Sequence, residues 1–135
     1  MLLEAIRQAA HRVSGHLDAT AQRVGVGRAE AHVLVHLHGG PATPGGLHRQ
    51  LGLRSSTLTN VIDRLEAAGY VARRVTRDRR SKEVHLTAAG KRAAVSLADV
   101  LLELEQRVQS SVTERDLAGC MAVLAAIEQE ASDDG

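Results

Sequence analysis

Aromatic side chains are almost absent from this chain of 135 residues: it has no tryptophan and no phenylalanine, and Tyr70 is its only tyrosine. A core must therefore be built from leucine, valine, isoleucine and alanine, and a site that stacks aromatic rings on a ligand or on bases is nearly excluded. No apolar run approaches the roughly 18 residues that a membrane helix needs. The first ten residues also lack the order of a secretion signal, which favours a cytoplasmic protein without a membrane partner.

Cysteine is equally scarce, because Cys120 stands alone. A single cysteine excludes an internal disulfide, and no cysteine cluster suggests zinc. Cys120 lies beside Met121 in an apolar stripe, so we expect a buried and unreactive thiol. The chain also has no glycine-rich phosphate loop, no serine elbow and no spaced Cys–His pair, so the sequence predicts neither an enzyme nor a cofactor. Its length predicts one domain over residues 1–135.

The net charge of +1 hides a strong segregation of charge along the chain. Residues 47–92 contain eleven basic and four acidic side chains, a local net charge of +7. Residues 93–135 contain two basic and nine acidic side chains, a local net charge of −7. A basic centre of this kind suits a polyanion such as nucleic acid, although a solvated charged surface would have the same composition.

Apolar periodicity predicts long amphipathic helices at both ends of the chain. One covers residues 2–21, a second covers about 88–112 with its first turn capped by Thr87, and a third begins at Thr113. Their apolar stripes are too long for a small domain to cover, so a second copy of the chain is the simplest partner. The residues predicted at this dimer interface are Leu3, Ile6, Val13, Leu101, Leu104, Val108, Leu117 and Leu124, and Leu97 opens the same seam.

The middle of the chain predicts a helix-turn-helix. A helix over about 28–38 is stopped by glycines, Thr43 and Pro44 begin a short helix that Gly52 ends, and a serine-rich cap leads into a helix over 55–68. The last of these has Leu58, Val61, Ile62 and Leu65 on one side. Its opposite side carries short polar groups and an arginine, which can reach a base edge or a phosphate.

A basic hairpin is predicted directly after this helix. Residues 70–76 and 83–87 alternate as strands do, with Val71 and Val75 on one face. The segment between them, 77–82, contains four cations in six residues. A projecting basic tip beside a recognition helix is a wing, and its arginines are suited to the backbone or the minor groove. The predicted fold class is therefore mainly α with a small β wing.

These segments resemble the MarR family, the multiple-antibiotic-resistance-type regulators. The stretch 55–71 is similar to the family's recognition helix, and Asp78-Arg79-Arg80 followed by Val84-His85-Leu86-Thr87-Ala88-Ala89-Gly90 is similar to its wing and the exit into the long helix. The resemblance implies a winged helix-turn-helix, with a DNA-binding lobe over about 28–87 and dimerisation helices over about 1–24 and 88–131. It further implies a homodimeric transcription regulator, usually a repressor, that reads a pseudo-palindromic operator until a small molecule or another signal releases it.

The resemblance also assigns DNA-contacting residues. On the recognition helix and its start these are Ser55, Ser56, Thr57, Thr59, Asn60 and Arg64. In the wing, Arg80 would enter the minor groove, Asp78 would orient the wing arginines, and Arg77, Arg79 and Lys82 would contact phosphates. Members of the family often carry a basic residue where Asn60 stands, and asparagine can bind an adenine edge, so the preferred base can differ here.

Two alternatives stay open at this point. A winged helix can be a protein-interaction module that never binds DNA, although a basic outer face argues against it. The seven histidines also allow a metal-responsive regulator, because His32 and His36 are one turn apart on a helix. No third ligand stands at a clear spacing, with Glu30 the nearest candidate, so no metal site is predicted.

Overall fold

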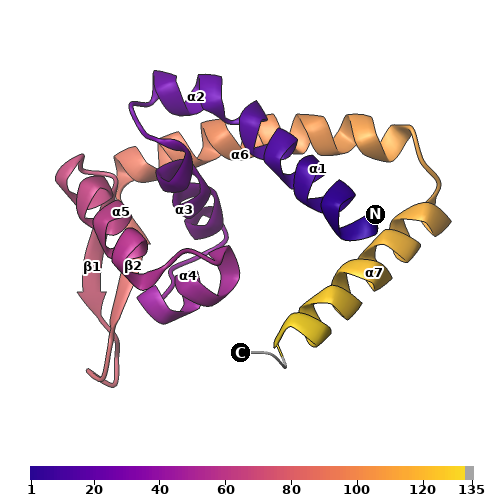
Figure 1. Cartoon of the computed structure of the whole chain (residues 1–135). Coiled ribbons are helices and arrows are strands. Elements are labelled where there is room, and N and C mark those ends of the chain that lie inside the picture. Colours follow the sequence, from indigo (N-terminus) through magenta and orange to yellow (C-terminus); the bar gives the residue numbers. More distant parts are fainter. Residues whose placement is uncertain (133–135) are drawn as a thin grey trace. The chain divides into compact units, whose positions relative to one another are not determined.

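The computed structural model describes residues 1–132, which form seven helices and a two-stranded sheet (Figure 1). The elements in chain order are α1 (Leu2–His16), α2 (Asp18–Arg23), α3 (Arg28–His38), α4 (Pro44–Leu51), α5 (Ser55–Ala67), β1 (Val71–Val75), β2 (Lys82–Leu86), α6 (Ala88–Ser110) and α7 (Glu114–Ser132). Two compact units result, Met1–Leu101 and Leu102–Gly135, and their boundary falls inside α6. None of the helices in the described chain is long and apolar enough to cross a bilayer.

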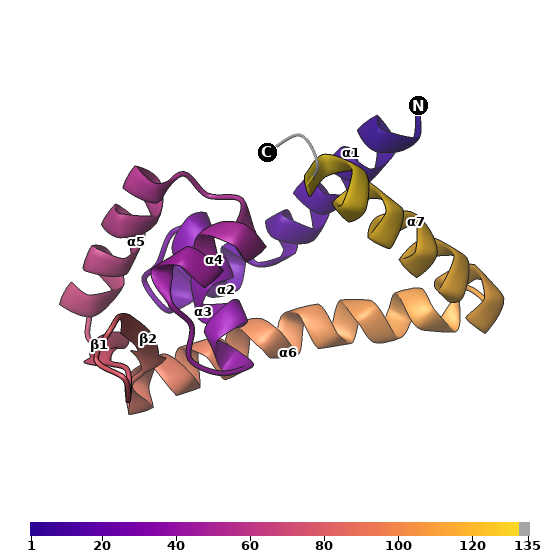
Figure 2. The same ribbon diagram turned by 90° about the horizontal axis from the view of Figure 1, so that it is seen from below.

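The core of the first unit is aliphatic, as the composition requires, and α3 lies at its centre. This helix packs against α2, α4, α5 and β2, and the views from two directions agree on this arrangement (Figure 2). The apolar side of α5 is buried as predicted, and Leu97 of α6 is also fully buried. The single aromatic ring closes an edge of this core, because the hydroxyl of Tyr70 donates to the carbonyl of Val24.

Most predicted helix boundaries are confirmed by their capping contacts. Thr43 Oγ1 accepts from the backbone N–H of Gly46 at 3.1 Å, Thr87 Oγ1 accepts from that of Gly90 at 3.0 Å, and Thr113 Oγ1 accepts from Asp116 N at 3.1 Å. Gly52 ends α4 in the left-handed region, with φ of 66°, which glycine adopts without steric cost.

The serine-rich cap was placed wrongly. Arg54 precedes α5 without a side-chain capping bond, and Ser55 already lies in the first turn of the helix. The hydroxyl of Thr59 bonds to the backbone carbonyl of Ser55 instead. The side chains of Ser55, Ser56 and Thr57 in this first turn are exposed.

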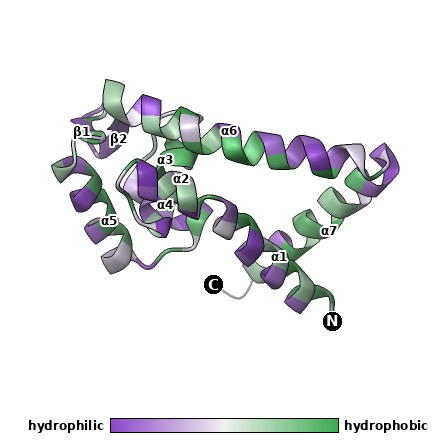
Figure 3. Cartoon of the chain, turned by 90° about the horizontal axis from the view of Figure 1, so that it is seen from above, coloured by the Kyte–Doolittle hydropathy of each residue, from purple (hydrophilic) through white to green (hydrophobic). Residues whose placement is uncertain are grey.

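The predicted N-terminal helix is broken at Leu17. The backbone N–H of Leu17 donates to Ser14 rather than continuing the α-helical pattern, and α2 begins at Asp18. The break has a packing reason: Leu17 and Ala21 enter the core, whereas no residue of α1 is buried. In Figure 3, green apolar residues lie beside purple polar residues along α1.

The two strands pair in the antiparallel register Val71↔Leu86 to Val75↔Lys82. Ala42, in the loop between α3 and α4, forms an isolated β-bridge with Val84. The backbone N–H of Ala42 donates to the carbonyl of Val84 at 3.2 Å, and the N–H of Val84 donates to the carbonyl of Ala42 at 2.7 Å. Val71 is buried, but Val75 is 59% exposed, because the hairpin extends beyond the core. Val71 and Val75 share one face of the strand, as predicted, but the core covers only Val71.

The predicted seam on α6 divides between two environments. Leu97 is buried in the core and Leu101 packs against it, whereas Val108 is 48% exposed. The first half of the seam thus serves the chain's own core.

In the second unit, α7 has no buried residue, and Cys120 is exposed, so the prediction of a buried thiol is wrong for the single chain.

Candidate nucleic-acid interface

The outer face of α5 consists of short polar side chains. Its exposed members are Ser55, Ser56, Thr57, Thr59 and Asn60, all from the set assigned by resemblance. The helix turns them outward because its four apolar residues are buried against α3 and α4. The charged residues of this face, Asp63 and Arg64, follow one turn further along the helix, so the amide and hydroxyl groups of its first turns can approach a base edge directly.

Arg64 lies on the same helix but is held by a partner within the lobe. Its Nε lies 3.0 Å from Glu30 Oε1, and the other oxygen of Glu30 accepts from the backbone N–H of Gly27 at 3.2 Å. Glu30 therefore caps α3 and holds the recognition helix at the same time. The side chain of Glu30 is 14% exposed and that of Arg64 is 61% exposed, so solvent still reaches one side of this pair. Sequence reasoning considered Glu30 only as a possible metal ligand and missed this pair.

Arg73 is a second residue that sequence reasoning missed. It donates to Asp63 Oδ1 at 2.7 Å and to Glu66 Oε1 at 2.8 Å. One guanidinium thus joins β1 to α5 and offsets half of the negative charge of two carboxylates beside a surface proposed to meet a polyanion. The strand alternation was the available signal, because it places Arg73 on the face of Val71, toward α5.

The wing tip, residues 77–82, is organised by hydrogen bonds around Asp78. One oxygen of Asp78 accepts from the hydroxyl of Thr76 at 2.6 Å and from the backbone N–H of Arg80 at 3.1 Å. These bonds hold the pKa of the Asp78 carboxyl below its usual value, the Thr76 hydroxyl contributing most. Arg79 adopts φ of 59°, the only positive φ of a non-glycine residue in the described chain.

Asp78 therefore shapes the turn through the backbone and not through an ion pair with an arginine. Four basic side chains project from the turn, and none of them has an ion-pair partner within residues 1–132. All are exposed: Arg77, Arg79, Arg80 and Lys82. The tip presents these cations on a hairpin whose first strand packs against α5.

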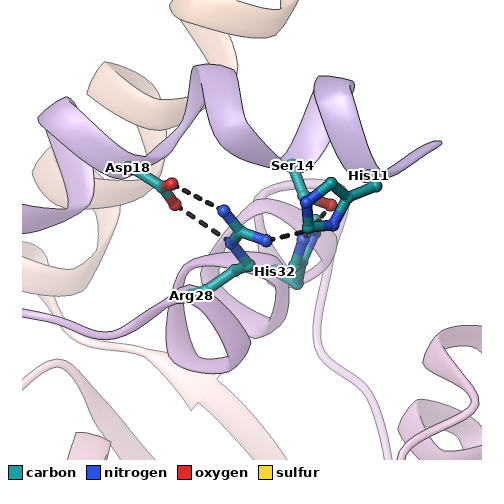
Figure 4. A network of polar contacts seen from close by, with 5 residues as sticks. All are labelled: His11, Ser14, Asp18, Arg28 and His32. Carbon is teal, nitrogen blue, oxygen red and sulfur yellow. Dashed lines mark hydrogen bonds and ion pairs between the residues drawn. The ribbon is translucent and has the colours of Figure 1, made fainter. Parts of the chain in front are cut away.

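Two of the histidines, His11 and His32, take part in polar contacts that connect α1 and α2 to α3. His32 of α3 and Ser14 of α1 are joined by a hydrogen bond of 3.0 Å, and Arg28 contacts Asp18 and His11 (Figure 4). These contacts attach α1, which has no buried residue, to α3. Within residues 1–132 no three potential metal ligands gather, and His32 and His36 gain no third partner.

We predict that His32 makes the fold sensitive to mild acid. Burial lowers the pKa of His32, Arg28 lowers it further and Asp18 opposes the shift. Because the folded pKa lies below the unfolded value of about 6.5, the unfolded chain binds the proton more readily. This group's contribution to stability is therefore present above about pH 6.5 and is lost as pH falls from there through the lower folded pKa. Urea unfolding of His32→Gln between pH 8 and 5 should therefore show a smaller decline than the parent.

The exposed His16 offers the control for this experiment, and His16→Gln should retain the parent's decline. Equal slopes for the parent and His32→Gln would show that His32 does not contribute.

Comparison with known proteins identifies this arrangement. The MarR family model matches residues 24–81, which contain α3 to β1 and most of the wing tip. That segment is of the MarR family. Together with the flanking helices and the β wing, this segment forms the MarR winged-helix fold, as predicted.

Solved structures share this fold over nearly the whole chain. Staphylococcus aureus MepR in its DNA-binding conformation matches with a TM-score of 0.85 and 20% identity, covering 96% of this chain and 98% of that one. A MarR-family regulator from Silicibacter pomeroyi matches with a TM-score of 0.79 and 25% identity, covering 91% and 84%. MarR from Oenococcus oeni matches with a TM-score of 0.81 and 16% identity, covering 96% and 99%. No curated protein matches the chain significantly.

Proposed function

We propose that this chain is a cytoplasmic, homodimeric transcription regulator without enzymatic activity that represses genes by binding a pseudo-palindromic operator. One observation carries the proposal: the exposed polar face of α5 occurs together with a hairpin that packs against α5 through β1 and ends in four cations unpaired within residues 1–132. The first feature supplies groups that read bases, and the second supplies charge for the DNA backbone. The MarR-family match of residues 24–81 supports the same function.

In the proposed complex, α5 enters the major groove and the wing follows the DNA backbone. Asn60 would bind an adenine edge through its amide, with the hydroxyl residues of α5 beside it. Arg80 would enter the minor groove, where guanidinium groups are favoured, and its neighbours Arg77, Arg79 and Lys82 would contact phosphates. Arg64 would act near the backbone while Glu30 holds it.

The DNA-binding lobe is proposed over about 28–87, and the flanking helices are proposed to form the dimer. Apolar side chains remain exposed on α1 and on α7, and a second chain would remove them from water. Leu3, Ile6, Val13, Leu104, Val108, Leu117 and Leu124 remain the candidates. Leu101 is a weaker candidate, since it already packs against the chain's own core.

Selection of bound duplexes from a random DNA library at about 150 mM salt tests the function, because non-specific binding is weak there. We expect an enriched inverted repeat whose half-site centres lie about 10–11 base pairs apart. Affinity for the selected site should fall steeply between about 50 and 200 mM salt, as counterion release requires. No enrichment, together with no salt-dependent duplex binding, would favour the protein-interaction module instead. The selected duplex also allows a screen for releasing molecules.

Arg80→Ala should weaken operator binding by about 1–3 kcal/mol, because it removes the proposed minor-groove contact while Asp78 still orders the turn. Fluorescence anisotropy with the selected duplex measures the loss. The matched control is Arg92→Ala, which removes the same charge from an exposed position on α6. A loss for Arg92→Ala equal to that for Arg80→Ala would show that only total charge matters and that the wing makes no specific contact.

A further inference from the structure

A second cationic site lies at the base of the wing, on a side of the lobe that α5 does not reach. A cavity of about 430 Å³ is bounded by the end of α3, the loop after it, both strands and the first turns of α6. Its basic lining consists of His38, Arg74, His85 and Lys91, and apolar residues including Leu37 and Val95 complete it. No carboxylate is among its lining residues.

The strand register explains why these basic groups converge. Arg74 faces Glu83 and Ala72 faces His85 across the sheet, so Arg74 and His85 share one face. Arg73 points to the opposite face and uses its guanidinium on two carboxylates of α5. Successive arginines of one strand therefore have different surroundings, one paired twice and the other lining the cavity.

The basic groups of the cavity are without partners. Within residues 1–132, His38, Arg74, His85 and Lys91 form no side-chain hydrogen bond or ion pair. Arg73, the neighbour of Arg74 in the same strand, is by contrast paired with both Asp63 and Glu66. Glu83 is the one carboxylate directly across the sheet from this group, and it does not line the cavity. The cavity thus keeps an excess of positive charge over an apolar wall.

We propose that this cavity binds a small phosphate monoester whose organic part is apolar. The phosphate would lie between Arg74 and Lys91, whose two permanent charges match its two negative charges, and the imidazoles of His38 and His85 would supply further hydrogen-bond donors. The organic part would lie against Leu37 and Val95. The site goes beyond the proposed DNA interface, because neither α5 nor the wing tip contributes a residue to it.

Isothermal titration of the full chain with phenyl phosphate, without DNA, tests the site directly. We expect saturable binding of one phenyl phosphate per chain. Inorganic phosphate should bind more weakly because it lacks the apolar part, and benzyl alcohol should not bind because it lacks the charge. Arg74→Gln and Lys91→Gln should each weaken phenyl phosphate binding about tenfold, the loss of one charged hydrogen bond. Arg92→Gln, next to Lys91 in sequence but outside the cavity, should bind as the parent does.

Circular dichroism spectra like the parent's establish that each variant is folded before its affinity is compared. Absence of saturable binding to the parent chain would overturn the proposal, and so would equal affinity in the parent, Arg74→Gln and Lys91→Gln. Equal weakening by Arg92→Gln would also overturn it, because binding would then depend on overall charge. The titration contains no DNA, so its result is independent of whether the chain binds an operator.

Discussion

Replacing Gly90 by alanine is expected to destabilise the chain by about 3 kcal/mol or more, at or above the upper end of what overpacking an interior usually costs. A Cβ at this position would lie 1.9 Å from the carbonyl oxygen of Tyr70 and 2.9 Å from its carbonyl carbon. These are backbone atoms that cannot rotate aside. The same carbonyl accepts a hydrogen bond of 3.0 Å from Thr87 N, so moving it would also disturb the start of α6.

Urea unfolding at a fixed chain concentration measures this loss, because association would make the apparent stability depend on concentration. Gly119→Ala on α7 is the matched control, since its added Cβ would meet nothing within 4 Å. It should stabilise the helix by about 0.5–1 kcal/mol through helix propensity. A loss below about 1 kcal/mol for Gly90→Ala would contradict the close approach of α6 to the strand.

Leu124→Glu is expected to abolish the proposed dimer. Leu124 is 36% exposed on α7 in the single chain, within the stripe assigned to the interface. In a dimer a buried and unpaired carboxylate would replace an apolar contact on both copies, which costs several kcal/mol. Multi-angle light scattering should report a monomer. Operator affinity should fall with it, because the two half-sites must be read together.

Gln129→Glu adds the same charge to α7 about 140° around the helix from Leu124 and should leave the dimer intact. Leu124 is a better probe than Leu101, where a charge would also disrupt the chain's own core. If Leu124→Glu stayed dimeric, the α7 stripe would not be the interface. If it became monomeric and kept the parent's operator affinity, paired half-sites would be unnecessary.

Much of the fold follows from local signals in the sequence. The buried side of α5 follows from four aliphatic residues at helical spacing, and the start of α6 from the hydroxyl of Thr87. The wing follows from strand alternation on both sides of a polar turn. These features depend on residues close together in sequence, so periodicity and capping preferences were sufficient to find them.

The remaining features depend on contacts between distant segments. The ion pair between Arg64 and Glu30 joins two residues that are far apart in sequence, so no local spacing predicts it. Likewise, nothing in the sequence of residues 2–21 marks the helix break that brings Leu17 into the core. Cys120 was misjudged for a related reason, because an apolar stripe predicts burial without specifying what covers it. The cavity at the wing base was missed because its basic residues come from four separate elements.

The bridge between Ala42 and Val84 has a mechanical consequence for control of DNA binding. It joins the loop before α4 to a strand of the hairpin, while Arg73 joins the neighbouring strand to α5. These contacts hold α5 and the wing in a fixed arrangement, so we expect the two to move as one rigid unit. A releasing signal would gain little by bending the hairpin alone. We expect it to change the distance between the two DNA-binding lobes of the dimer. Each lobe would keep its shape, but the two α5 helices would no longer be spaced by one turn of DNA.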